Sequence, residues 1–112
     1  MQEVTQWLNF VLHSTSKQYT LVATLPRLED HEILLKFQHP ASRNLAFNQL
    51  VRKYQSKVYW HVRKMVVDHD DADDLTQDVF VKVWKHLENF RQDAQLFTWI
   101  YRIATNECLS FL

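Results

Sequence analysis

The run DDADDLTQDVFVKVWKHL, from Asp70 to Leu87, constrains the fold of this 112-residue chain more than any other segment. Its apolar residues recur at steps of three and four, the period of a helix with one buried face. They are Leu75, Val79, Phe80, Val83 and Leu87. Asp70 or Asp71 can accept hydrogen bonds from the first free backbone N–H groups, and the lysines near the other end suit the helix dipole. The run therefore predicts one amphipathic helix.

The turn-forming residues indicate what joins this helix to the rest of the chain. Glycine is absent and there are only two prolines, Pro26 and Pro40. Because β-hairpin turns depend heavily on glycine and asparagine, this composition favours helices joined by polar loops. We expect an all-α fold, a compact helical bundle of about four to five helices.

Three further segments have helical patterns. Residues 29–38 form a plausible short helix that ends before Pro40, since the residue preceding a proline is disfavoured in the helical region. Ser42 is then a candidate cap for a long helix reaching to about Val67. A last helix begins near Leu96 or Phe97. Its expected inward residues are Trp99, Ile100, Ile103, Ala104 and Cys108.

The formal net charge is zero, but the charges are unevenly distributed. Residues 1–67 carry nine Lys/Arg and four Asp/Glu, a net charge of +5, whereas residues 68–112 carry four and nine, a net charge of −5. A basic helix next to an acidic one favours two surfaces for two partners. An ordinary solvated helix face explains the same charges equally well.

Other features bear on the compartment. No apolar run approaches the roughly 20 residues that a membrane span requires, and the N-terminus has no basic region followed by an apolar block. The lone Cys108 cannot form a disulfide within the chain, which is typical of a reducing cytoplasm. We therefore expect a cytoplasmic protein with no membrane partner.

The run DADDLTQDVFVKVWKHLENF, followed by LFTWIYRIATNECLSFL, resembles region 2 of bacterial RNA polymerase sigma factors of the sigma-70 family. It is most similar to the extracytoplasmic-function branch, whose members read roughly D-A-E-D-L-T-Q-E-x-F-x-x-x-W and then W-L-Y-R-I-A-x-N. The resemblance implies a region 2 domain over 29–112, preceded by an extension over 1–28. Members of this branch continue into a second helical domain, region 4, which reads the promoter −35 element. We therefore expect this chain to be a fragment without that domain.

The resemblance implies that the outer face of the helix over 70–87 binds core RNA polymerase, at the clamp helices of the beta-prime subunit. The residues implied for this contact are Asp74, Gln77, Asp78, Val81 and Lys85. Carboxylates and an amide can pair with arginines of a partner helix, while a valine supplies a desolvated contact. Trp84 lies at the margin between this face and the core, and we expect the core.

The resemblance also implies recognition and melting of the promoter −10 element as a single strand. The residues implied for DNA binding are Phe90, Arg91, Phe97, Thr98, Trp99, Tyr101, Arg102 and Asn106. Aromatic platforms with basic residues suit a single strand, and the loop over 91–95 would hold a flipped base. One departure affects that base: the family usually has Phe-Ser-Thr-Trp where this chain has Leu96-Phe97-Thr98-Trp99. Periodicity alone would place Trp99 and Ile103 in the core.

Two rival hypotheses remain. Asp70-Asp71-x-x-Asp74 matches a metal-binding D-D-x-x-D pattern, and magnesium needs only one or two carboxylates plus substrate phosphates. The chain has no second acidic cluster, however, and a capped helix start explains the same residues. A sigma-like interaction module without a DNA role is the other alternative. Our interpretation is a non-enzymatic sigma fragment with no cofactor, whose partners are core RNA polymerase, promoter DNA and an anti-sigma factor.

Overall fold

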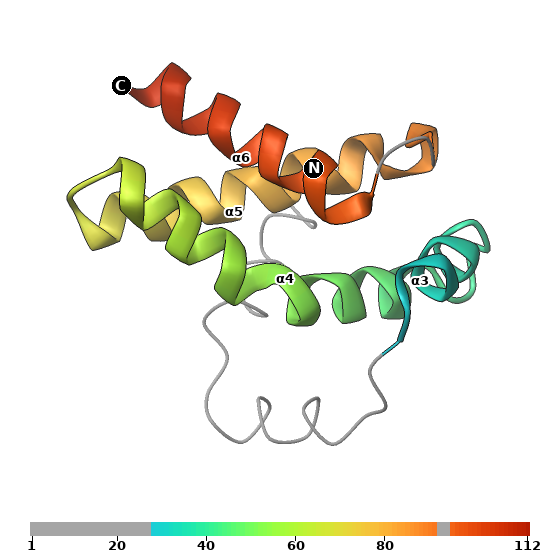
Figure 1. The fold of residues 1–112 in the computed structure, drawn as a ribbon. Coiled ribbons are helices and arrows are strands. Elements are labelled where there is room, and N and C mark those ends of the chain that lie inside the picture. Colours follow the sequence, from blue (N-terminus) through green and yellow to red (C-terminus); the bar gives the residue numbers. More distant parts are fainter. Residues whose placement is uncertain (1–27, 92–94) are drawn as a thin grey trace, which may run out of the picture. The chain divides into compact units, whose positions relative to one another are not determined.

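The computed structural model describes residues 28–91 and 95–112, and every regular element within these ranges is helical (Figure 1). In chain order the elements are α3 (Asp30–Phe37), α4 (Arg43–Met65), α5 (His69–His86), the 3₁₀ turn η1 (Leu87–Asn89) and α6 (Leu96–Phe111). The all-α prediction is confirmed. Within the described ranges, no helix is long and apolar enough to cross a membrane. Except for Leu28, the extension expected over 1–28 lies outside the described residues.

The chain divides into two compact units between Lys53 and Tyr54, inside α4. In the first unit, α3 and the first half of α4 bury an apolar cluster consisting of Ile33, Leu34, Phe37, Ala46, Phe47, Leu50 and Val51. The rings of Phe37 and Phe47 lie 6.3 Å apart between centroids. The Lys53 ammonium pairs with Asp30 at 2.7 Å, which ties α4 to the start of α3.

Ser42 directly precedes α4, the position predicted for its cap, but its hydroxyl bonds to the end of α3. Its hydroxyl donates a hydrogen bond backwards, to the carbonyl oxygen of Lys36 at 2.7 Å. The guanidinium of Arg43 donates likewise to the carbonyl oxygen of Phe37 at 2.9 Å. Helix ends leave carbonyl groups without intrahelical partners, so both side chains stabilise the end of α3. The Ser42 backbone carbonyl accepts from the Ala46 N–H at 2.9 Å, the first bond of α4.

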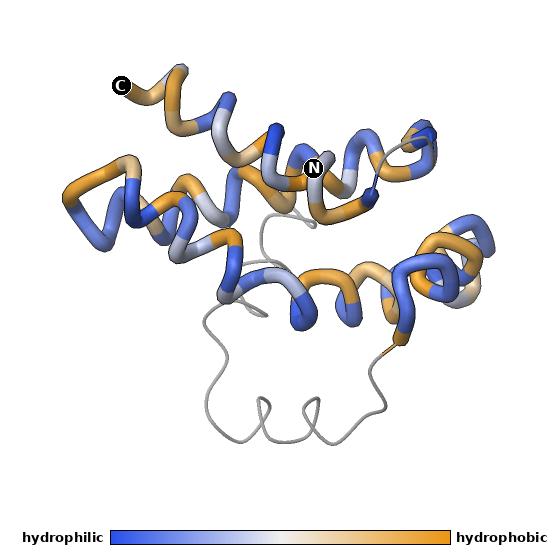
Figure 2. The backbone as a smooth tube through the Cα atoms, in the orientation of Figure 1, coloured by the Kyte–Doolittle hydropathy of each residue, from blue (hydrophilic) through white to orange (hydrophobic). Residues whose placement is uncertain are grey.

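The second unit contains the rest of α4 together with α5, η1 and α6, and α5 and α6 lie side by side (Figure 1). The five apolar residues predicted to form the inward stripe of α5 and its continuation are all buried. Figure 2 shows hydrophilic and hydrophobic residues alternating around each helix of this unit, as expected for helices with one buried face.

The cap of α5 lies two or three residues earlier in the chain than predicted. The capping residue is Asp68, whose carboxylate accepts hydrogen bonds from the N–H groups of Asp70 at 2.7 Å and Asp71 at 3.3 Å. Asp70 and Asp71 were predicted as the cap, but they lie in the first turn. Several adjacent carboxylates have the right chemistry for a cap, and only the backbone shows which of them precedes the helix.

Candidate functional site

Helix α6 presents four longitudinal rows of residues, each at steps of four. The innermost row is Ile100, Ala104 and Cys108, and all three are fully buried, as expected. Trp99 and Ile103, expected to point inward as well, are only half-buried. Each lies one position before the innermost row, or about 100° around the helix. They therefore form an edge of the buried face.

A second row of α6 faces α4 and forms a continuous stack with it, which we call the aromatic ladder. The ring of Phe97 stacks on Tyr54, with centroids 5.3 Å apart and an interplanar angle of 23°. Tyr101 contacts Phe97 at 4.5 Å and stacks on His61 at 4.0 Å. A hydrogen bond of 2.8 Å between His61 Nε2 and the Thr105 hydroxyl completes the ladder. Two predicted DNA-binding residues, Phe97 and Tyr101, are thus also packing residues.

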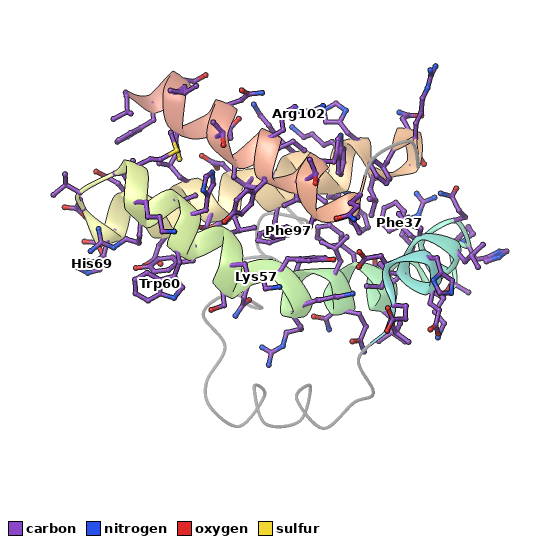
Figure 3. The ribbon with its side chains drawn as sticks, viewed as in Figure 1. Phe37, Lys57, Trp60, His69, Phe97 and Arg102 are labelled. Carbon is purple, nitrogen blue, oxygen red and sulfur yellow. The ribbon has the colours of Figure 1, made fainter. Side chains whose placement is uncertain are left out.

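Lys57 and His61 were not among the candidates from the sequence, although both contact that row of α6. The Lys57 ammonium lies over the Phe97 ring, 5.3 Å from its centroid (Figure 3). The pKa of His61 is lowered by burial and then by the positive charge of Lys64. A signal was available, because Tyr54, Lys57 and His61 follow one another at steps of three and four and so share a helix face.

The third row of α6 is exposed and consists of Thr98, Arg102 and Asn106. Figure 3 shows Arg102 on the side of α6 away from α4. All three were predicted to bind DNA, and the structure brings them together on one surface. An arginine and an amide are the side chains that commonly contact phosphates and base edges.

Phe90 and Arg91 come just before the gap in the described residues. The Phe90 ring packs on Trp99 with centroids 4.9 Å apart, and both residues are half-buried. Arg91 is exposed. The predicted base-holding loop lies mostly outside the described residues, since 92–94 are not described. What the structure does show is that Phe90 places the start of this loop next to α6.

The five residues implied for polymerase binding lie on one side of α5. Asp74, Asp78 and Lys85 are exposed, and Gln77 and Val81 are half-buried. This surface, which we call the α5 face, therefore has a partly apolar centre at Val81 with carboxylates on one end and an ammonium on the other. Trp84 lies at the edge of this face. We expected it in the core, but it is only half-buried.

The fourth row of α6 includes Glu107, which pairs with Lys82 of α5. Asp78 lies close enough to this ion pair for both charges to affect the pKa of its carboxyl. Partial desolvation raises the pKa of the Asp78 carboxyl above its ordinary value, and the negative charges of Glu107 and Asp74 raise it further, while Lys82 offsets part of the effect. Sequence reasoning missed both Lys82 and Glu107, because their pairing depends on how α5 and α6 pack.

The acidic start of α5 was the basis of the metal hypothesis. The side chains of Asp68, His69 and Asp70 offer ligand atoms within 4.8 Å of one another, and all three residues are exposed. Asp68 already accepts two backbone hydrogen bonds as the helix cap. Helix capping thus accounts for the position of Asp68, whereas the sequence had pointed to Asp70 or Asp71 as the cap.

Comparisons with known proteins agree with this geometry. The family model described as sigma-70 region 2 matches residues 50–112, more than half of the chain. The chain is 36% identical over 88 residues to the RNA polymerase sigma-H factor of Pseudomonas aeruginosa, covering 79% of this chain and 45% of that protein. It is 42% identical over 67 residues to the ECF RNA polymerase sigma-E factor of Escherichia coli K12, covering 60% of this chain and 35% of that protein. The chain thus spans less than half the length of these curated relatives.

A solved structure has a similar fold. It is an NMR structure of an engineered region 2 of sigmaE in complex with GTAAAA, and it matches with a TM-score of 0.67 and 32% identity. The match covers 79% of this chain and 90% of the engineered protein. In that relative, a domain of this fold binds a six-nucleotide DNA.

Proposed function

The chain belongs to the sigma-70 region 2 family, in its extracytoplasmic-function branch, and on this premise we propose that it tethers core RNA polymerase to a promoter −10 element. In this proposal the α5 face binds the beta-prime clamp helices, and α6 with Phe90 and Arg91 binds and helps to melt the DNA. The family consists of non-enzymatic initiation factors, so RNA synthesis belongs to the polymerase. The polymerase as partner implies a cytoplasmic location.

The observation that carries the DNA-binding half is the exposed row of Thr98, Arg102 and Asn106, which lies directly beside the row of Phe97 and Tyr101. A row of exposed polar and basic side chains next to aromatic rings has the chemistry that single strands require: contacts to phosphates and base edges, with rings available for stacking. The GTAAAA complex of a 32% identical domain supports the same assignment.

The polymerase-binding half rests on the α5 face. Exposed carboxylates at Asp74 and Asp78 can form charge-assisted hydrogen bonds with arginines of a partner, and Val81 gives the contact an apolar centre. The raised pKa of Asp78 fits this role, because a cationic partner would relieve the repulsion from Glu107 and Asp74. An anti-sigma factor is the further partner that we propose, since it would control access to these faces.

Capture by bacterial core polymerase tests the proposal. The charge-reversing variant Asp74→Arg combined with Gln77→Ala should abolish capture, because it places a cation against the arginines that we propose on the partner. Glu32→Arg, which reverses an acidic charge on α3 and so outside the α5 face, is the control and should retain capture. Circular dichroism should show equal helical content in all three proteins.

Each result distinguishes between alternatives. If the wild-type chain is not captured, the sigma assignment loses its main physical claim. Capture that survives in the Asp74→Arg, Gln77→Ala variant would mean that another face binds the polymerase. If capture is normal and a labelled GTAAAA hexamer is not bound, the chain is a sigma-like interaction module without a DNA role.

A further inference from the structure

Trp60 is 60% exposed on α4, in the second unit. Large aromatic side chains are usually buried, because removing their apolar surface from water stabilises the fold, and Trp60 lacks most of this stabilisation. Tyr59 packs edge-on against its ring, with centroids 5.2 Å apart and an interplanar angle of 81°. Figure 3 shows Trp60 projecting from α4. The ring is therefore supported on one edge and open on the other.

Two exposed lysines flank this ring. Lys57 lies three residues before Trp60 and Lys64 lies four residues after it, so both are its neighbours on the helix surface. The whole of α4 has six basic residues and no acidic one. We call Lys57, Trp60 and Lys64 the α4 stripe. Its charge and its open ring together suit an anionic partner with flat apolar groups.

The α4 stripe is continuous with the surface already described on α6. The Lys57 ammonium lies over the Phe97 ring and so touches both the stripe and the aromatic ladder. Figure 3 shows Phe97 and Lys57 close together where α6 meets α4, with Trp60 further along α4, so a strand that reaches the Phe97 ring could continue to Lys57 and Trp60. A protein partner fits less well, because lysines are depleted in the buried centres of protein interfaces, whereas stacking rings between cations are typical of single-strand channels.

We propose that the α4 stripe is a second single-stranded DNA subsite, at which Trp60 stacks on a base and Lys57 and Lys64 neutralise phosphates of nucleotides flanking the −10 element. The inference deepens the proposed function and rests on it. Similarity to the domain that binds GTAAAA does not by itself imply this subsite, because our proposed function places the hexamer on α6 and Phe90.

Fluorescence anisotropy with two kinds of labelled probe tests this subsite: the bare hexamer GTAAAA, and the same hexamer extended by six thymidines, in one version at its 5′ end and in another at its 3′ end. For the wild-type chain, extension at one end should raise the affinity. Trp60→Ala should remove a gain of roughly 5- to 150-fold, the range for one stacked base. Trp60→Phe should keep most of it. Lys64→Gln should lower the slope of log affinity against log salt by about 0.7 on the extended probe.

The controls separate this inference from the proposed function. Affinity for the bare hexamer should not change in the Trp60 and Lys64 variants. Leu35→Ala, which truncates another exposed apolar residue (64% exposed), should behave as wild type on both probes. If the wild type binds the hexamer but gains nothing from extension, or if Trp60→Ala keeps the gain, the subsite is refuted while the proposed function stands. If Trp60→Ala instead loses polymerase capture with unchanged affinity for the extended probe, the α4 stripe binds protein and the subsite is likewise refuted. Failure of the wild type to bind either probe refutes the subsite and the DNA-binding role together.

Discussion

The ammonium group of Lys82 on α5 pairs with the carboxylate of Glu107 on α6. The side chain of Glu107 is 14% exposed and that of Lys82 is 53% exposed, so the carboxylate lies largely out of water while its partner reaches the surface. Helix α5 carries the proposed polymerase contact, and α6 carries the proposed DNA contact. The ion pair therefore joins the two helices on which initiation would depend.

Replacing Lys82 with alanine should destabilise the fold by about 1–2 kcal/mol, more than a surface ion pair usually contributes, because it leaves the Glu107 carboxylate unpaired and close to Asp78. Urea denaturation measures the change. Adding Glu107→Gln should recover part of the loss, and the double-mutant cycle gives the pairwise term. Lys85→Ala, an exposed lysine on the same helix, should change stability by less than about 0.5 kcal/mol. Equal effects of the two lysine variants would contradict a specific role for Lys82.

Asp78→Asn should stabilise the isolated chain at neutral pH. The pKa of Asp78 is raised in the folded state, so its ionisation opposes folding as the pH rises above the ordinary value of 3.8. The asparagine variant lacks this penalty, and its advantage should be below about 1 kcal/mol because the residue is exposed. Thermal unfolding at several pH values should show the advantage shrinking to zero as the pH falls below 3.8. If the same variant is captured less well by core polymerase, the Asp78 carboxylate destabilises the isolated chain but contributes to binding.

His61 should titrate below its ordinary pKa of 6.5, because burial and Lys64 both disfavour its charged form. The contribution of His61 to stability is then fully present above pH 6.5 and declines as the pH falls below it. NMR titration of the ring resonances gives the pKa directly, and Lys64→Gln should raise it. Between pH 7.5 and 5.5, His61→Gln should lose less stability than the wild type. An unshifted His61 in the wild type would exclude this effect.

The inward stripe of α5 was predictable because a buried face repeats with the helical period, which depends only on local geometry. The same holds for Ile100, Ala104 and Cys108 on α6. Trp99 and Ile103 show the limit of that rule: periodicity gives a direction around the helix, whereas half-burial depends on which helix packs there. The exposed row that contains Arg102 was predictable too, because it lies on the side of α6 opposite the buried row.

The aromatic ladder could not be predicted, because it depends on where α4 and α6 approach each other. Tyr54 is buried, whereas His61 and Tyr101 are compatible with an ordinary half-buried face, and only packing places the three in one stack. Caps were uncertain for a different reason. Ser42 and the aspartates before α5 all have a side-chain oxygen suited to capping, and the backbone conformation selects among them.

Two of the rows of α6 that carry predicted DNA residues, the exposed row and the aromatic ladder, should respond differently to substitution. Arg102→Ala and Asn106→Ala remove exposed side chains, so each should leave stability within about 0.5 kcal/mol and weaken binding of the GTAAAA hexamer. Phe97→Ala also breaks contacts with Tyr54 and Tyr101 and should cost more than about 1 kcal/mol of stability. Its loss of hexamer binding must therefore be measured at a temperature where the variant is still folded. If Arg102→Ala and Asn106→Ala both bind the hexamer as the wild type does, the strand does not follow the exposed row. A loss confined to Phe97→Ala would then place the strand on the aromatic ladder, with Lys57 as its cation.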